Sequence, residues 1–312
     1  MGGYHHGEIA VQERAGFVRP AGQAHGSIDN TVPPVAAAFL AQQPFIVMGG
    51  TDERGRIWAT QLTGEPGFLT VPEPHTLNIG ALPPPEDPLA GLLAGAGSGV
   101  GGEPARIGMI GIEPATRRRM RMNGRAFRDG DGLRVELDQV ISNCPKYIQK
   151  RDHHPVTETG SPASSRTAVD STELSPGQQR TLRAADTFFV ATASDRGDAD
   201  ASHRGGNPGF VQVLSPRLLR WPDYAGNAMF LTLGNLELNP AAGLFVPGWE
   251  TGASLHLTGS ARTVWDEEEV ARHPGAQRLV EFEITAVREI SAASPLRWSA
   301  PAFSRFNPPT TG

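Results

Sequence analysis

The sequence predicts a mainly β protein with short helices, built as two tandem antiparallel barrels. Three observations lead to this fold class: runs of alternating apolar and polar residues, a Ser-, Thr- and Pro-rich stretch near the middle of the chain, and an internal repeat across that stretch. A chain of 312 residues is long enough for two domains. We expect the first barrel at residues 1–152, a linker at 153–179 and the second barrel at 180–312.

The repeat is clearest where residues 45–71 are placed over residues 187–213, which align without a gap. Each copy has a β-rich run, an acidic turn containing Arg-Gly, a second strand, a Gly-x-Pro-Gly-Phe corner and a third strand. Chance does not easily supply both the turn and the corner at a fixed separation. Internal duplication is therefore the better interpretation.

Other segments also occur in pairs. The stretches "PPVAAAFLAQQ" and "SPGQQRTLRAAD" predict helices that lead into the two barrels, the second with Ser175 as N-cap and Pro176 at the first helical position. The runs "DGLRVELDQVI" and "QRLVEFEITAVREI" predict long closing strands. About six or seven short strands in each half are typical of a small closed or partly open barrel.

Composition limits the class of partner. The chain is 38% hydrophobic and 20% charged, with a formal net charge of −5, so it has no general attraction for nucleic acid or anionic membranes. The basic run "RRRMRMNGRAFR" alternates Arg with Met, which favours a strand with one wet face over a nucleic-acid patch. With no secretory signal or membrane-spanning stretch evident, we expect a cytoplasmic protein with a small-molecule substrate and no nucleic-acid or membrane partner.

Cysteine and histidine content gives no metal site. The single cysteine, Cys144, excludes an intramolecular disulfide and a Cys-based zinc cluster, and we expect it to be a small buried residue. His5, His6 and Glu8 near the N-terminus are better explained by a mobile end or a helix packed on the barrel than by metal binding. We therefore expect no metal.

Several stretches resemble the pyridoxamine 5'-phosphate oxidase-like, FMN-binding split-barrel family, in its branch of predicted flavin-nucleotide-binding proteins. They are "MIGIEPATRRRMRMNGRA" and "DQVISNCPKYIQKR" in the first half, and "DASHRGGNPGFVQV", "WPDYAGNAMFLTLGNLELNPAAGLFVPG" and "LHLTGSAR" in the second. The resemblance implies split barrels that usually pair as homodimers, with FMN across the interface. A chain with two barrels would be a fused pseudo-dimer, present as a monomer or as a homodimer.

FMN requires cations for its phosphate, backbone N–H donors for its oxygens, and small polar side chains. Gly226 and Asn227 precede a predicted short helix, and its start suits a phosphate. The resemblance favours Lys146 across the interface. From the first half the expected contacts are Arg119, Lys146, Tyr147 and Gln149; from the second they are Ser202, His203, Arg204, Asn207, Tyr224, Gly226, Asn227, Thr232 and Asn235.

The two halves are not chemically equivalent. Residues Thr60, Gln61 and Leu62 occupy the positions of Ser202, His203 and Arg204, so the fold alone does not require charge there. The first half also lacks the Asn-Thr-Asn pattern, which predicts one intact site per chain. Each candidate keeps a structural alternative: a surface salt bridge for Arg204, a hydrogen bond within the barrel for His203, and a solvated basic helix for Lys146.

The resulting function is an FMN-dependent oxidoreductase acting on an unidentified small molecule, with His203 and Arg204 as catalytic candidates that polarise the ring or bind an anionic substrate. The alternative is a non-catalytic flavin- or haem-binding protein, because fold does not fix function. Haem would need an axial ligand, for which His203 and His256 are the nearest candidates. Deazaflavin F420 stays open as a cofactor.

Overall fold

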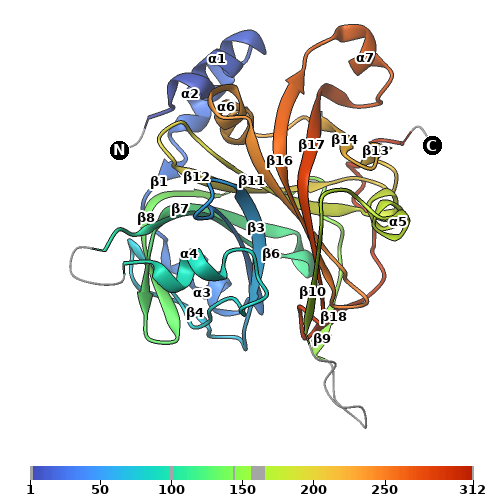
Figure 1. Cartoon of the computed structure of the whole chain (residues 1–312). Helices are drawn as coiled ribbons and strands as arrows, with labels where there is room; N and C mark the ends of the chain where they lie inside the picture. The colour runs from blue at the N-terminus through green and yellow to red at the C-terminus, as the bar shows by residue number, and fades with distance from the viewer. Residues whose placement is uncertain (1–2, 98–101, 143–144, 156–165, 311–312) are drawn as a thin grey trace.

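Two large antiparallel sheets make up most of the molecule (Figure 1). The computed structural model describes residues 3–97, 102–142, 145–155 and 166–310, so Cys144 and part of the predicted linker lie outside the described residues. The first sheet has the order β3 (Ile57–Thr63), β2 (Phe45–Thr51), β6 (Ala105–Glu113), β7 (Arg118–Asp129), β8 (Gly132–Ser142), β5 (Thr76–Ile79) and β4 (Leu69–Glu73), with β1 (Ile28–Asp29) on β8.

The second sheet repeats this order strand for strand. It runs β12 (Ala199–Gly205), β11 (Thr187–Ala193), β15 (Ala241–Pro247), β16 (Ser254–Val264), β17 (Ala276–Ser291), β14 (Leu218–Tyr224) and β13 (Gln212–Ser215), with β10 (Thr167–Ser171) on β17. A separate pair joins β9 (His153–Pro155) to β18 (Leu296–Trp298). The mainly β fold class with two tandem barrels is thus confirmed.

The registers agree with the gapless alignment of the sequence. Met48 pairs with Thr60 in the first sheet as Val190 pairs with Ser202 in the second. Both closing ladders also contain a bulge at a glycine that a side chain would crowd. A Cβ on Gly124 would lie 2.2 Å from the Glu136 carbonyl oxygen, and one on Gly259 would lie 1.9 Å from that of Glu283.

Helices lie at matching places in the two halves. The lead-in helices are α3 (Pro34–Ala41) and α5 (Pro176–Ala184), and Ser175 caps α5 as predicted, its hydroxyl oxygen accepting from the Gln178 amide at 3.3 Å. Helices α4 (Ala90–Gly95) and α6 (Leu231–Leu238) follow β5 and β14. The remaining helices are α1 (His6–Arg14), α2 (Val18–His25), η1 (Pro114–Thr116) and α7 (Glu267–Ala271).

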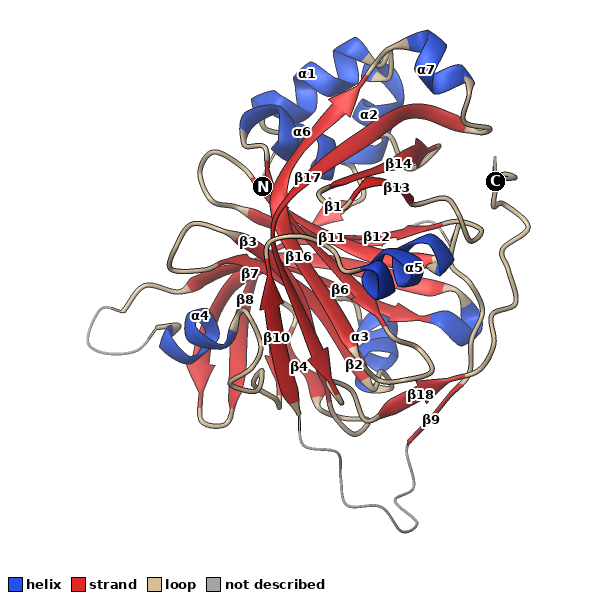
Figure 2. Cartoon of the chain, turned by 45° about the vertical axis from the view of Figure 1, so that its right-hand side comes forward, coloured by secondary structure: helices blue, strands red, loops and turns tan. Residues whose placement is uncertain are grey.

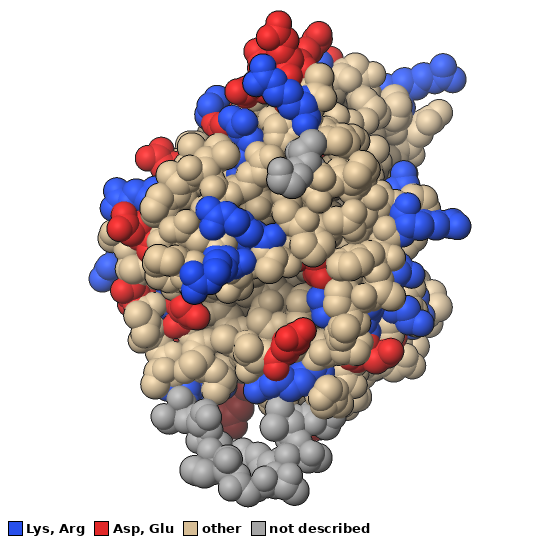
Figure 3. Space-filling view, turned by 90° about the vertical axis from the view of Figure 1, so that its right-hand side faces the viewer, with Lys and Arg blue, Asp and Glu red and all other residues tan. Residues whose placement is uncertain are grey.

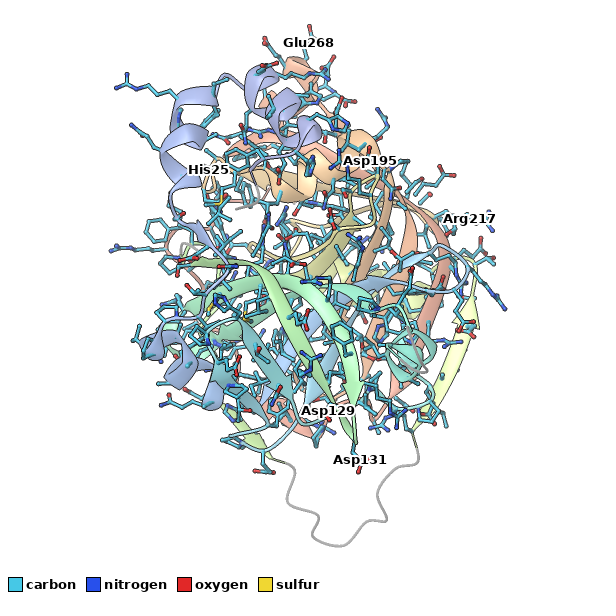
Figure 4. The ribbon with its side chains drawn as sticks, turned by 90° about the vertical axis from the view of Figure 1, so that its left-hand side faces the viewer. His25, Asp129, Asp131, Asp195, Arg217 and Glu268 are labelled. Carbon is cyan, nitrogen blue, oxygen red and sulfur yellow. The ribbon has the colours of Figure 1, made fainter. Side chains whose placement is uncertain are left out.

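Most of the helices that have no counterpart in the other half gather at one end of the molecule. Figure 2 shows α1, α2 and α7 there, beside α6. In Figure 4, His25 and Glu268 mark this end, and Asp129 and Asp131, on the β7–β8 hairpin, mark the opposite one. The N-terminal helices therefore lie beside a helix of the second half.

The barrels pack on each other through β2, β3 and β6 of one and β11, β12 and β15 of the other. Their contacts are reciprocal: a Cβ on Gly108 would lie 2.3 Å from the backbone of Asp200, and one on Gly243 would lie 2.5 Å from that of Ile57. Gly49 meets Ala191 between them. Reciprocal contacts of equivalent residues are the mark of a two-fold interface, here formed within one chain. Large apolar side chains of this interface include Phe45, Val47, Ile110, Phe189 and Phe245.

No helix among the described residues is long and apolar enough to cross a membrane.

Candidate functional site

A cleft of about 140 Å³ lies where the two barrels meet. Strand β7 of the first barrel and β12 of the second form its inner wall, and the segment from β14 to α6 forms its rim. It is therefore built from both halves of the chain. Its charged and polar lining residues are Arg119, Arg121, Lys146, Tyr147, His203, Arg204, Asp223, Tyr224, Asn227, Thr232 and Gln277.

The arginines of the inner wall differ in their partners. Arg121 lies 3.3 Å from the buried carboxylate of Asp200 and donates a hydrogen bond to Ser202. Arg204 donates through Nη1 to the His203 carbonyl oxygen at 3.1 Å, and its Nε is buried without a partner. Within the described part of the chain, no carboxylate forms an ion pair with Arg204. Burial lowers the pKa of Arg204, as expected of a cation taken out of water.

His203 is held as a neutral hydrogen-bond donor. Arg119 donates from Nη1 to His203 Nδ1 at 2.9 Å, which makes Nδ1 the acceptor and leaves the proton on Nε2. Burial, and then the charges of Arg119 and Arg204, hold the pKa of His203 well below its usual range. His203 is 5% exposed, and its buried Nε2 has no partner in the described residues. His203 Nε2 is therefore an N–H donor with unused capacity at the cleft.

An aromatic pair and a strained loop form the rim. Tyr147 and Tyr224 lie 5.2 Å apart between ring centroids, and Tyr147 donates its hydroxyl to the Ala225 carbonyl. Burial raises the pKa of Tyr224 to about 12, so its hydroxyl stays protonated. In the loop at 225–230, Ala228 and Phe230 have φ of 63° and 61°, in the left-handed region that side chains seldom adopt.

Some predicted site residues do not line the cleft. Ser202 lies beneath it, bonded to Arg121 and to Thr232, which is itself a lining residue. Gln149 donates to the Gly206 carbonyl of the corner and accepts from the Ser304 amide of the tail, Asn207 donates to the Pro308 carbonyl, and Asn235 is bonded to His5 and Thr192. The cleft brings together Arg119, Lys146, Tyr147, His203, Arg204, Tyr224, Gly226, Asn227 and Thr232.

Sequence reasoning missed two contributors. Phe17, from the turn between α1 and α2, lines the cleft and packs edge-on to Phe230 at 5.8 Å. Asp200 accepts from Thr232 at 3.2 Å and holds Arg121. Asp200 stands two residues before Ser202, so strand alternation could have placed both on one face. Nothing local to Phe17 indicates its position.

The arginines of the basic run have different partners. Arg117 donates to the carbonyls of Ile148 and Ala302, which ties β7 to the C-terminal tail, and Arg125 pairs with Asp138 at 3.2 Å. Only Arg119 and Arg121 line the cleft. On the face that carries the C-terminal end, Lys and Arg side chains form a group at mid-height, with acidic side chains mainly above and below (Figure 3).

A second, smaller pocket of about 30 Å³ also lies between the two halves, at the place related to the cleft by the internal two-fold arrangement. Its β16 residues Ser254 and His256 stand where β7 has Arg119 and Arg121, since Arg121 faces Ile110 as His256 faces Phe245. Ser254 bonds His256 Nε2 at 2.7 Å, and His256 Nδ1 donates to the Ala59 carbonyl at 2.9 Å. Asp87 bonds Thr60, and burial raises its pKa.

The structure also bears on metals and haem. No group of three or more His, Cys, Asp or Glu residues in the described ranges could hold a metal ion. His5 caps α1, with its Nδ1 accepting from the Gly7 and Glu8 amides. His256 has both ring nitrogens bonded and is 1% exposed, so of the two histidines considered for haem only His203 has a ring nitrogen without a partner in the described residues, and that nitrogen carries the proton.

Comparison with known proteins agrees with this architecture. Residues 174–294 match the family model described as pyridoxamine 5'-phosphate oxidase. No curated protein matches the chain.

Several solved structures match with low scores. HupZ of Group A Streptococcus is 11% identical with a TM-score of 0.30, over 36% of this chain and 92% of that one. A FAD-binding protein of Mycobacterium smegmatis is 18% identical with a TM-score of 0.28, over 39% and 98%. A pyridoxamine 5'-phosphate oxidase-related, FMN-binding protein of Nostoc punctiforme is 11% identical with a TM-score of 0.28, over 41% and 92%. The family match covers residues 174–294, and the first sheet repeats the strand order of the sheet in that region, so the chain is similar to the pyridoxamine 5'-phosphate oxidase-like split-barrel family in two tandem copies.

Proposed function

We propose that this protein is an FMN-dependent oxidoreductase that binds one flavin per chain in the cleft between its barrels and acts on a small molecule. The observation that carries the proposal is Arg204: a half-buried cation on the cleft wall whose Nε is buried without a hydrogen-bond partner, and which forms no ion pair with a carboxylate of the described residues. A cation partly removed from water is stabilised by an anion that accepts its hydrogen bonds. A phosphate dianion is such an anion.

The charges of the cleft support an anionic ligand. Asp200 pairs with Arg121, and Asp223, which lines the cleft, lies 3.5 Å from Arg278, which does not. Arg204 and Lys146 form no ion pair with a carboxylate of the described residues, and they line the cleft together with Arg119 and Arg121. A guanidinium binds phosphate oxygens with two parallel hydrogen bonds, which a lysine cannot do. The residues present therefore fit a flavin nucleotide.

FMN, when bound, supplies hydride or electron transfer. The chain's own groups bind and orient it: Arg204 and Arg119 neutralise the phosphate, and His203 donates from Nε2 to an acceptor atom of the ligand. Arg119 keeps His203 in that tautomer, so the donor is available at every pH at which the imidazole stays neutral. The tyrosine pair covers the rim and limits the access of water.

The first experiment is the absorption spectrum of the purified protein, with mass identification of whatever is released on denaturation. FMN near one equivalent per chain is the expected result. A Soret band would replace the proposal with haem binding, and released deazaflavin would replace FMN with F420. No bound flavin even after added FMN would overturn the proposal.

The second experiment places the site. Arg204→Leu gives the cleft the residue that the first half has at the equivalent position, and it should weaken FMN binding by roughly tenfold to a hundredfold, the usual value of a charged hydrogen bond. Gln61→Ala, at the counterpart of His203, is the matched control and should leave the affinity unchanged. Flavin fluorescence titration measures both. Equal affinity for Arg204→Leu and wild type would show that the phosphate lies elsewhere.

The third experiment separates an oxidoreductase from a flavin carrier. The flavin of the FMN-loaded protein is reduced anaerobically, then mixed with oxygen or with candidate oxidised small molecules, and its reoxidation is followed by absorbance. Reoxidation by one small molecule that is faster than that of free reduced FMN supports catalysis. If bound flavin never reacts faster than free flavin with any acceptor tested, the protein is a non-catalytic binder.

A further inference from the structure

The N-terminal helix pair, residues 5–26, belongs to the first half by sequence but packs on the second. Helix α1 lies so close to α6 that a Cβ on Gly7 would be 2.3 Å from the Gly234 carbonyl oxygen. His5 bonds the Asn235 side chain at 3.0 Å, and Gln12 donates to the Met229 carbonyl at 3.1 Å. These contacts fix the start of α6 and the end of the rim loop.

A series of cations and rings continues the contact toward the cleft. The Arg14 guanidinium lies 4.6 Å from the Trp265 ring, and the Arg278 guanidinium lies 5.2 Å from Trp265 and 4.8 Å from Phe230. Phe17 then meets Phe230 edge-on. Each cation over a ring contributes favourably, more so when shielded from water as at Arg278. Phe230, held from two sides, is one of the residues with positive φ.

The helix pair covers one site and not the other. In the counterpart helix α4, a Cβ on Gly91 would meet only the end of the Glu53 side chain among the described residues, and no helix backbone. Helix α6 is buried along most of its length, whereas α4 is mostly half-buried or exposed. In Figure 1, α1 and α2 lie beside α6 at the top, while α4 lies lower in the view, on the first barrel. The extra helices thus accompany the cation-lined cleft.

We propose that residues 5–26 act as a clamp that holds the rim loop at 225–230 and the start of α6 in place, and thereby sets how fast the bound flavin nucleotide leaves. The loop's two left-handed residues need external restraint, because strain of this kind persists only where the surroundings impose it. The identity of the ligand rests on the proposed function, whereas the restraint itself rests on the contacts. Loss of the clamp would speed release more than it alters association.

The test uses Arg14→Ala and Gly7→Val, neither of which changes a residue that lines the cleft. Hydrogen exchange of residues 229–238 in the flavin-free protein reports the restraint without any ligand. Both variants should accelerate it by on the order of tenfold, because local opening becomes easier. Arg19→Ala, an exposed arginine on α2, is the matched control and should exchange as wild type.

Flavin release is then followed by fluorescence after dilution. The clamp is supported if Arg14→Ala and Gly7→Val accelerate both exchange and release while Arg19→Ala alters neither. It is overturned if exchange is unchanged, or if exchange rises and release does not. If the wild type binds no FMN, the proposed function fails, and the exchange result alone decides whether the helix pair restrains α6. Should Gly7→Val fail to fold, Arg14→Ala carries the test.

Discussion

The cleft and its smaller counterpart occupy equivalent places in the two halves, yet their chemistry is opposite. One has Arg119, Arg121 and Arg204 on its walls, and the other has Ser254 and His256 at the positions of Arg119 and Arg121. The counterpart of Arg204 is Leu62, which is buried in the core of the first barrel and does not line the smaller pocket. Even the buried acids differ, since Asp200 is paired with a guanidinium and Asp87 bonds a hydroxyl. The two sheets have the same strand order although these side chains differ, so the strand order does not require either group of residues. The difference between the two pockets is therefore not imposed by the fold.

The largest effect should come from the interface that both pockets share. Gly108→Val and Gly243→Val each place a side chain against backbone of the other barrel, and we expect each to lower the free energy of unfolding by on the order of 3 kcal/mol or more. Thermal melts measure the loss. Gly22→Ala, on α2 with nothing within 4 Å, is the control and should be neutral. A large difference between the two valine variants would show that the halves do not share their interface equally.

The next largest loss of stability should distinguish the buried polar cluster around Arg121 from the one around His256. Arg121→Met leaves Asp200 buried without its counter-charge and should cost roughly 3–5 kcal/mol, by the general behaviour of broken buried ion pairs. His256→Gln, at the equivalent position, removes no charge and should cost about 1–2 kcal/mol. Urea denaturation compares them. Adding Asp200→Asn to Arg121→Met should recover much of the loss, and no recovery would contradict the pairing.

A pH-dependent effect should belong to the smaller pocket. Burial raises the pKa of Asp87 above the value of 3.8 for a free Asp, so its contribution to stability is complete below that value and is lost as pH rises through the folded-state pKa. Asp87→Asn removes the titrating group. The variant should therefore gain on the wild type as pH rises from 4 to about 8. Parallel stability curves for the two proteins would refute this assignment.

The smallest effect concerns the edge of the cleft. Lys146 is half-buried, and its ammonium lies 5.8 Å from the Phe306 ring, so Lys146→Ala should weaken FMN binding by only about threefold to tenfold. Lys150→Ala is the matched control, because Lys150 is exposed and does not line the cleft. Raising the salt concentration should reduce the difference between Lys146→Ala and wild type. Equal affinities of both lysine variants would place the phosphate away from this edge.

Much of the fold could be predicted because it depends on local patterns. The gapless repeat gave the strand equivalences that the registers show, and the Ser-Pro start of α5 gave its capping box. Substitution of Ser202-His203-Arg204 by Thr60-Gln61-Leu62 located the difference between halves. Both inferences rest on short, continuous stretches of the sequence.

The remainder depends on contacts between distant segments. Asn235 fits a phosphate motif by its position, yet His5 reaches its side chain from the other end of the chain. Phe17 and Asp87 enter their pockets through packing that no periodicity encodes. Composition gave no hint that helices preceding one barrel cover the other. These contacts form only when segments that are distant in the sequence pack together in the folded chain.

The reciprocal glycine contacts join two halves that are also one covalent chain. In a homodimer every substitution appears twice, so a change that improves one site alters the other equally. Here Leu62 and Arg204 are separate codons, and each site can change without its twin. Pairing within a chain is also independent of protein concentration, so dilution cannot separate the walls of the cleft. Covalent linkage thus allows the two pockets of one chain to acquire different lining residues.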